Sequence, residues 1–361
     1  TSKRPTSYAL STFLEHFGAE YNGITSTETV EYFVRILGEH AEVAFDYISD
    51  IVQNSQLKPE DIEKERKVIG QEAAMKKDNP GDVLSRETQT TLYPNQPSGR
   101  TIFHEVPNLS KMDEKTLRGY MERVYVADNF LLTVGGNISL EDCRKFTQKY
   151  FVSFRSGNKN KFQPSHIEKN EIIKITPSTY GQSKLNISFT AFPADTVEEL
   201  VAGAVGLVLG GGFSSRLTNR LRHEKHLVYS ISAFADSNSD SGSFSIRTYL
   251  DEANVQRAIN EIYDVVKIFL SEGLTDGELE KIKNTLLSNL STNMERLGAY
   301  ADFFATSVLF NRPVFSIQEW KDRIIGLDAE FIMSIAKKIF SDKPKVNLLT
   351  KNLREVTVPN L

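Results

Sequence analysis

The chain has 361 residues, of which 40% are hydrophobic and 25% are charged, and its formal net charge is −4. This length predicts about two domains, and the composition is that of an ordinary globular protein. The weak negative charge argues against nucleic-acid binding, and no run approaches the roughly 20 apolar residues of a membrane span. Because Cys143 is the only cysteine, an intrachain disulfide and a cysteine-based zinc site are excluded. Any metal therefore needs His, Asp or Glu ligands.

Residues 5–37 predict a helix, a stop at Gly18 and then an extended segment. Asn22 and Gly23 fall in the extended part, where an edge strand is expected. A peptide in extended form could add to such an edge by backbone hydrogen bonds, which makes both residues candidates for substrate binding. An ordinary turn at Asn22 and Gly23 explains the same residues and remains an alternative.

Residues 59–78 predict one helix, because a proline and two acidic residues open it and an Asn-Pro-Gly sequence follows it. Glu65 and Glu72 lie seven residues apart, which is about two helical turns. Both flank an apolar stripe of Ile62, Ile69 and Ala73. We therefore expect the two carboxylates to be half buried and to point the same way. A solvated glutamate face is the alternative, since carboxylates at this spacing are common on amphipathic helices.

An internal repeat relates the two halves of the chain. Residues 57–64 (LKPEDIEK) resemble residues 274–281 (LTDGELEK), and each segment follows a long amphipathic helix, expected at 39–54 and 253–271. A duplicated domain is the simplest account of this pattern.

The polar stretch 156–170 is the predicted linker between a domain of residues 1–155 and a second domain of residues 171–361. In the repeat, Glu65 corresponds to Ile282 and Glu72 to Asn289. The carboxylate pair therefore belongs to the first copy only, and the second copy is expected to be non-catalytic.

Strand candidates come in runs that are followed by runs of helix. This order favours two α+β domains, each a mainly antiparallel sheet with helices packed on one face, over a doubly wound parallel fold. The expected strands are residues 30–37, 130–134, 185–192, 228–235, 243–249 and 346–350.

The second half carries a glycine-rich segment, residues 209–217 (LGGGFSSRL), without the Gly-Lys-Ser/Thr that a phosphate-binding loop requires. A tight bend or a mobile loop near substrate is expected there instead. Arg222 and Tyr229 follow, where a predicted helix ends and a predicted strand begins. A purely structural interpretation is that Arg222 lies at the helix end and that Tyr229 is a half-buried strand residue. His223 and His226 lack a third ligand nearby, and His104 stands alone.

Together, the pattern of residues 5–37, the Glu65 and Glu72 spacing and the duplicated halves resemble the insulinase, or mitochondrial-processing-peptidase-like, family of zinc metallopeptidases. The resemblance implies that Glu72 is a zinc ligand and that Glu65 is a catalytic residue supporting the site. The family's His-x-x-Glu-His sequence is nowhere in residues 1–361, and Glu15-His16 lies too close to Glu72 to replace it. The resemblance therefore implies a zinc helix upstream of Thr1, a first domain truncated at its start, and a chain that is inactive alone.

The activity implied by the resemblance is zinc-dependent endopeptidase cleavage of peptides or unfolded segments held in a chamber between domains. Zn²⁺ would be the cofactor, Arg222 would bind the peptide, and Tyr229 would bind the peptide and stabilise the oxyanion as a catalytic residue. A homodimer, or a heterodimer with a related chain, is the implied assembly. A cytoplasmic location is favoured, although a targeting segment before Thr1 is not observable.

Two rival functions remain open on the sequence. A non-catalytic partner or scaffold subunit of the same family is favoured by the missing motif. Retention of Glu65, Glu72, Arg222 and Tyr229 argues against that rival, because a subunit without zinc has no need of these residues. An unrelated α+β binding module would require the repeat and the spacings to be coincidental.

Overall fold

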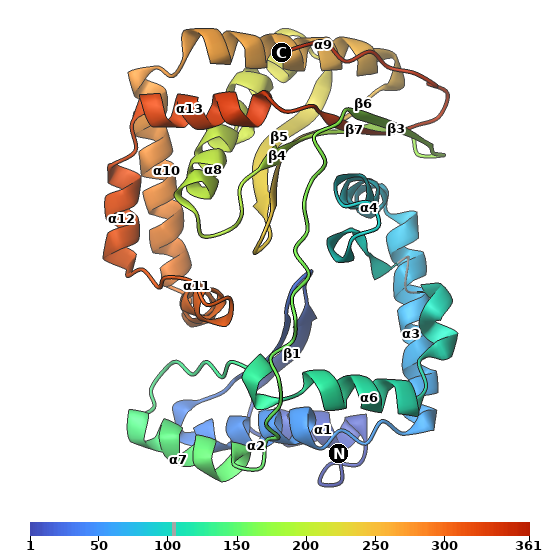
Figure 1. Cartoon of the computed structure of the whole chain (residues 1–361), viewed down its shortest axis with the longest axis vertical. Coiled ribbons are helices and arrows are strands. Elements are labelled where there is room, and N and C mark those ends of the chain that lie inside the picture. The colour runs from blue at the N-terminus through green and yellow to red at the C-terminus, as the bar shows by residue number, and fades with distance from the viewer. Residues whose placement is uncertain (103–105) are drawn as a thin grey trace. The chain divides into compact units, whose positions relative to one another are not determined.

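A computed structural model describes residues 1–102 and 106–361, which group into two compact units (Figure 1). Unit 1 comprises Thr1–Gln71, Glu105–Phe162 and Asn293–Val314. Unit 2 comprises Glu72–His104, Gln163–Thr292 and Phe315–Leu361. The chain is 53% helical and 15% strand, so the predicted α+β class is confirmed. In the described part of the chain, no helix is both long and apolar enough to cross a membrane.

Unit 1 is mainly helical. The side chain of Thr6 caps its first helix by accepting the Ala9 N–H at 3.0 Å, and Gly18 ends the following turn at a φ of 63°, as predicted. The elements of unit 1 are α1 (Ser7–Glu15), β1 (Glu20–Thr25), β2 (Val30–Arg35), α2 (Ala41–Gln53), most of α3 (Pro59–Asp78), α6 (Glu114–Val124), α7 (Leu140–Phe151) and α11 (Leu297–Leu309).

The predicted strand at residues 130–134 is wrong, because this segment forms no strand in the structure. Leu131, Leu132 and Val134 are exposed. A strand needs a neighbour to pair its backbone groups, and the two described strands of unit 1, β1 and β2, pair only with each other. The apolar residue pattern is therefore present here without regular secondary structure.

Unit 2 contains, among the described residues, a five-stranded sheet in the order β3-β7-β4-β6-β5. β3 and β7 are parallel and the other neighbours are antiparallel. The strands are β3 (Ile172–Pro177), β4 (Ser183–Ala191), β5 (Val228–Ser237), β6 (Gly242–Leu250) and β7 (Lys345–Thr350). The helices are α4 (Pro80–Leu92), α8 (Val197–Gly210), α9 (Val255–Glu272), α10 (Asp276–Met294, up to Thr292 in this unit), α12 (Ile317–Ile325) and α13 (Ala329–Phe340).

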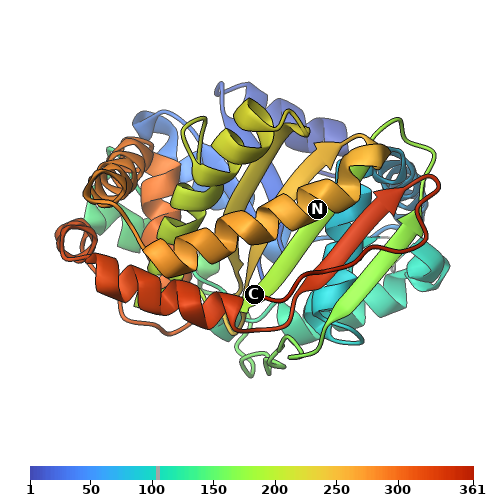
Figure 2. The ribbon, with the colours of Figure 1, turned by 90° about the horizontal axis from the view of Figure 1, so that it is seen from above.

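One face of this sheet is apolar and carries the main core. Leu185, Ile187, Ile246 and Val346 point to that face and are at most 1% exposed. They pack against buried side chains of α8, α9 and α13. In Figure 2, α9 crosses over this face, and the strands at the β7 and β3 edge remain uncovered by a helix. The predicted helix at 253–271 and the strand predictions in this half are confirmed as α9 and β4 to β7.

The opposite face is polar, because successive side chains of a strand alternate between faces. The strand register places Ser232, Arg247, Asn186, Asn347 and Lys174 in one row across all five strands. α4 packs on this face against β7 and β4, below the sheet in Figure 1. The sheet thus has a dry side and a polar side that is partly covered by one helix.

Glycines let α8 approach β5 more closely than other residues would. A Cβ atom at Gly210 would lie 2.1 Å from the backbone N of Ala233, and one at Gly206 would lie 2.9 Å from the Ala233 carbonyl oxygen. At Gly203, one turn earlier, a Cβ would meet nothing within 4 Å. Gly206 and Gly210 are therefore packing requirements, whereas Gly203 is not.

Alanine at these glycines should act in opposite directions. We expect G210A to destabilise unit 2 by about 1–3 kcal/mol, because strand backbone cannot move aside as a side chain can. G203A is the matched control and should stabilise it by about 0.5–1 kcal/mol, since alanine is the better helix former. Thermal unfolding followed by circular dichroism measures both; a G210A midpoint equal to that of G203A would contradict this packing account.

Candidate functional site

Glu65 and Glu72 both lie on α3, in one unbroken helix that ends at Asp78 as predicted. The expectation of half-buried carboxylates is wrong, because both residues are exposed. Ala73 is the one buried residue of α3, so the contact face is too narrow to cover residues 60–80° to its side. Their spacing still directs both side chains to the same side of the helix, roughly 10 Å apart along its axis.

The carboxylates of Glu65 and Glu72 also have no ion-pair or hydrogen-bond partner among the described residues. Asp61 and Glu63 on the same helix form ion pairs with Lys64 and Arg66, three residues further on. Neither Glu65 nor Glu72 forms an ion pair or hydrogen bond with any described residue. Exposed, unpaired carboxylates on one side of a helix can accept a metal ion or a hydrogen-bond donor.

A complete metal site is not present in the described part of the chain, where no group of three or more His, Cys, Asp or Glu side chains could hold an ion. His223 and His226 thus find no third ligand among these residues, and His104 lies outside them. Glu72 offers one carboxylate, whereas a zinc site needs at least three protein ligands. The described residues therefore do not make a zinc site by themselves.

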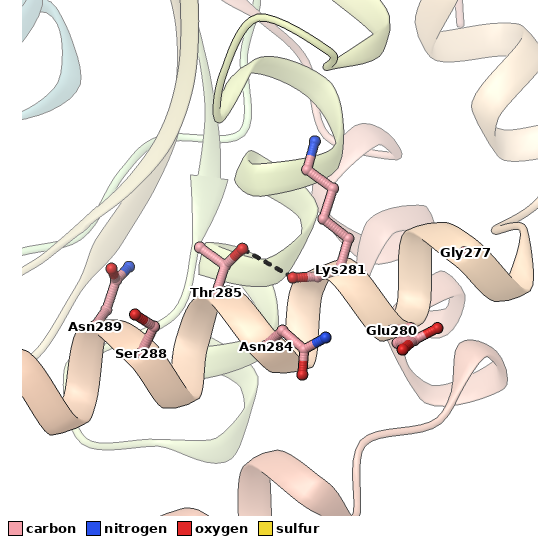
Figure 3. Close-up of a pocket in the computed structure, with 7 residues that line it drawn as sticks. All are labelled: Gly277, Glu280, Lys281, Asn284, Thr285, Ser288 and Asn289. Atoms are coloured by element: carbon pink, nitrogen blue, oxygen red, sulfur yellow. Dashed lines mark hydrogen bonds between the residues drawn. The ribbon is translucent and has the colours of Figure 1, made fainter.

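The repeat counterpart of α3 has a different surface. A depression of about 520 Å³ runs along α10 and contains no aspartate and a single glutamate, Glu280 (Figure 3). Ile282 occupies the position that corresponds to Glu65, and Asn289 occupies the one that corresponds to Glu72, so neither carboxylate has an acidic counterpart on α10. This surface can form hydrogen bonds but lacks an acidic pair for a metal. Its lining residues are Gly277, Glu280, Lys281, Asn284, Thr285, Ser288 and Asn289.

Asn22 and Gly23 lie on β1, so the alternative of an ordinary turn is wrong. β1 pairs with β2 on one side, and no described strand pairs with its other side. The Gly23 N–H donates to its neighbour's side-chain oxygen, Asn22 Oδ1, at 2.8 Å. The Tyr32 ring of β2 lies 3.3 Å from where a Cβ of Gly23 would be. A larger residue at position 23 would therefore crowd Tyr32, and an incoming strand could replace the local Asn22 bond.

The structure brings Arg222 and Tyr229 together, which the sequence analysis did not predict. A π-helix (Thr218–Glu224) carries Arg222, and a register shift between Val228 and Ser230 releases Tyr229 from the alternation of β5. Tyr229 is 77% exposed rather than half buried, so the purely structural alternative does not describe it. The Arg222 guanidinium carbon lies 4.9 Å from the centre of the Tyr229 ring.

The sequence analysis missed Phe213 as a third member of this group. Phe213 comes from the glycine-rich segment, is 74% exposed, and its ring centre lies 5.2 Å from the Arg222 guanidinium carbon. The Arg222 guanidinium is therefore close to two exposed rings, and it forms no ion pair with a described residue. Cation–π contacts hold the guanidinium in place and leave its N–H groups available for an acceptor. The sequence signal that could have identified it is a phenylalanine directly after three glycines.

The glycine-rich segment is anchored at its far end. Arg216 makes two bonds of 2.7 Å to the Glu278 carboxylate and a third of 2.7 Å to the Gly273 carbonyl. Lys281 Nζ donates to Ser214 Oγ at 2.6 Å. The Arg216 partner holds the pKa of Glu278 below its usual value. This anchoring places Phe213 on a short loop between α8 and the π-helix.

Comparison with known proteins assigns the family. The model of the insulinase family, peptidase M16, matches residues 1–105, and that of the peptidase M16 inactive domain matches residues 111–286. The chain belongs to the insulinase family, M16. An uncharacterized zinc protease of Rickettsia felis is 28% identical over 91% of this chain and 79% of its own length. One from Bacillus subtilis is 26% identical over 93% of this chain and 82% of its own length.

Solved structures of M16 relatives share the fold. A protease from Helicobacter pylori superposes with a TM-score of 0.85 at 17% identity, covering 95% of this chain and 84% of its own. An M16 inactive domain from Pseudomonas fluorescens gives 0.86 at 17% identity, covering 98% of this chain and 85% of its own. At this identity the likeness establishes the M16 fold alone. The family models, and not these structures, confirm the family resemblance of the sequence.

The anchor of the glycine-rich segment should depend on pH. The pKa of Glu278 is lower in the folded state, so its stabilisation is fully present above the unfolded pKa of about 4.3 and is lost as the pH falls through the folded pKa. We expect E278Q to lower the free energy of unfolding by about 1–2 kcal/mol at pH 7 and by much less near pH 3. Urea unfolding at both pH values measures this.

Glu280 on the same helix supplies the control for that experiment. It forms no ion pair with a described residue, so E280Q should leave the urea midpoint unchanged at both pH values. An E278Q deficit of the same size at pH 3 and pH 7 would show that the carboxylate charge is not what stabilises the anchor.

Proposed function

We propose that this M16 chain is the substrate-holding part of a zinc-dependent endopeptidase that cleaves extended peptides or unfolded segments. The observation that carries the proposal is the pair of exposed, unpaired carboxylates at Glu65 and Glu72 on one side of α3. Two neighbouring acids of the helix, Asp61 and Glu63, do form ion pairs. Cations are therefore available on α3, and Glu65 and Glu72 do not pair with them. Unpaired acids at a fixed spacing are expected of a site that binds a metal ion.

In this proposal the peptide is held through its backbone. The unpaired side of β1 at Asn22 and Gly23 accepts an extended strand, which explains recognition without a fixed sequence. Arg222 and Tyr229 donate hydrogen bonds to peptide carbonyl oxygens. The Tyr229 O–H is the donor assigned to the oxygen that becomes negatively charged during cleavage, where a positioned donor is most effective.

Glu72 supplies one metal ligand in the proposal, and Glu65 orients the site as a neighbouring acid. The described residues hold no complete metal group, so in this proposal the remaining ligands come from elsewhere in the protein. We derive no catalytic step through zinc from the residues of this chain. What supports zinc here is the acidic pair, together with the names of the Rickettsia and Bacillus relatives, which are zinc proteases.

The second candidate is a non-catalytic partner subunit, paired with a related chain that carries the activity. The match of residues 111–286 to an M16 inactive domain favours it, as does the incomplete metal group. In both candidates we propose a homodimer, or a heterodimer with a related M16 chain. The two candidates differ in whether this protein itself binds zinc and hydrolyses peptides.

Glutamine substitutions on α3 test the proposal in the protein expressed from its whole gene. We expect E72Q to abolish bound zinc and peptide hydrolysis, and E65Q to lower zinc affinity by about 10–100-fold, as loss of an orienting group does. Zinc content by inductively coupled plasma mass spectrometry and cleavage of a quenched fluorescent peptide are the measurements. E63Q is the matched control on the same helix and should change neither, since Glu63 is paired with Arg66.

A substitution at Tyr229 tests the proposed oxyanion donor independently of the metal ligands. Y229F should lower kcat by about 100-fold or more with zinc content unchanged, because it removes a donor to the developing oxyanion. A whole-gene protein without zinc or hydrolysis would reject the enzyme proposal and leave the partner subunit. Zinc binding that survives E72Q would reject the ligand assignment.

A further inference from the structure

The polar face of the unit 2 sheet holds an arginine that the proposed function does not use. Arg247 on β6 lies in the cross-strand row with Ser232, Asn186, Asn347 and Lys174. Residues directly opposite one another on neighbouring strands share a face, so all five side chains belong to the polar side. Arg247 is half buried in this row.

The two cations of the row, Lys174 and Arg247, differ in whether a carboxylate pairs with them. Lys174 Nζ lies 2.7 Å from Glu87 Oε2 of α4, so a carboxylate neutralises it. Arg247 has no carboxylate partner among the described residues. Its Nε donates to Asn186 Oδ1 at 3.2 Å, and its guanidinium carbon lies 5.3 Å from the centre of the Phe234 ring. The two terminal nitrogens, Nη1 and Nη2, have no described acceptor.

A second cation lies beside Arg247. Lys184 on β4 is paired with Tyr249, the residue two positions beyond Arg247 on β6, and its Nζ stacks 3.7 Å from the Tyr249 ring centre. Lys184 also forms no ion pair with a described residue. Asp236 is the acid that raises the pKa of Arg247 from a distance, but it makes no ion pair with the arginine.

Burial makes this arrangement costly without an anion. It lowers the pKa of both Arg247 and Lys184, so each cation has lost hydration that no described carboxylate replaces. Asn347 Nδ2, in the same row, is a further buried donor without a partner among the described residues. The face therefore holds two cations, Arg247 and Lys184, that have no ion pair with a described residue, and a buried amide donor, Asn347 Nδ2, without a described partner.

The face is open beside Arg247. α4 covers the β7 and β4 side, where Thr91 Oγ1 bonds Asn347 Oδ1 at 2.8 Å. Ser230 and Ser232 of the edge strand β5, on the other side of Arg247, are exposed. A ligand thus has access to Nη1 and Nη2 over β5 and β6.

We propose that Arg247, assisted by Lys184, binds a carboxylate of the peptide substrate and makes the protein selective for acidic peptides. The inference rests on the proposed peptide-holding function and adds the substrate class to it. The end of the guanidinium offers two parallel N–H donors, which match the two oxygens of a carboxylate. The carboxylate comes from an Asp or Glu side chain or from the peptide C-terminus, because both present the same group.

Peptide binding to the full chain tests this without requiring catalysis. The probe is a fluorescein-labelled nonapeptide of Ala, Ser and Val in which one Glu is moved through each position, with a Gln counterpart for each. Every peptide is made with an amidated and with a free C-terminus, which separates the two sources of carboxylate. Fluorescence anisotropy should show one acidic position, or the free C-terminus, binding about tenfold more tightly than its neutral counterpart.

Variants then assign the preference to Arg247. R247M keeps the aliphatic stem and should abolish the preference while leaving the affinity for the neutral peptide unchanged. R247K keeps a charge and should restore part of the preference. K174M is the matched control, because Lys174 lies in the same row but is already paired with Glu87, and it should retain the full preference.

The outcomes separate this inference from the function on which it rests. Equal binding of acidic and neutral peptides by the wild-type chain, or a preference that survives R247M, overturns the role of Arg247 while peptide binding stands. Binding of no peptide at all overturns the peptide-holding function and this inference with it. If R247M does not fold by circular dichroism, the wild-type preference and its change in R247K decide.

Discussion

The alternation of side chains along the strands of unit 2 is the constraint on which the rest of the arrangement depends. One face of the sheet must be apolar, since α8, α9 and α13 bury most of it. Every intervening residue is thereby placed on the other face, whatever its chemistry. Arg247, Asn186 and Asn347 are together because the register of β6, β4 and β7 leaves them no alternative.

A local break in that alternation produces the exposed tyrosine. Val228 and Ile231 are both buried on the apolar side, although strict alternation would separate them. The register shift between Val228 and Ser230 accommodates the extra residue, and Tyr229 is released to solvent beside Arg222. Glycine-rich backbone before the π-helix then allows Phe213 to reach the same guanidinium.

α3 shows a different use of regular geometry. A helix repeats its direction almost completely after seven residues, so Glu65 and Glu72 share a side without any tertiary contact. That relation was predictable from sequence, because it depends on the helix alone. Their exposure was not predictable, because it depends on how much of α3 the surrounding chain covers, and only Ala73 is buried.

The same distinction separates what the sequence predicted from what it missed. Helices such as α2 and α9 and the strands β4 to β7 follow from periodicity, which is local. The segment 130–134 has the composition of a strand but lacks a partner strand, and pairing is not encoded in the segment itself. Arg247 belongs to no sequence motif. It is a candidate because no carboxylate of a described residue pairs with it, and this can be known only from the register of several strands and the position of α4.

The division of the chain could be anticipated only in part. The duplicated sequence predicted two similar halves, and the linker at 156–170 remains a prediction. Contacts instead assign residues 72–104 to unit 2 and residues 293–314 to unit 1, and these segments occupy related places in the repeat. Such an exchange is decided by tertiary packing and leaves no periodic signal.

The central claim is that this M16 chain holds an extended peptide along β1. Hydrogen–deuterium exchange of residues 19–26, with and without a saturating extended peptide, tests it most directly. The account predicts slower exchange at the Gly23 amide, because a strand bound along the unpaired side of β1 would replace its local bond to Asn22 Oδ1 with a backbone hydrogen bond. Unchanged exchange throughout β1 under saturating peptide would contradict it.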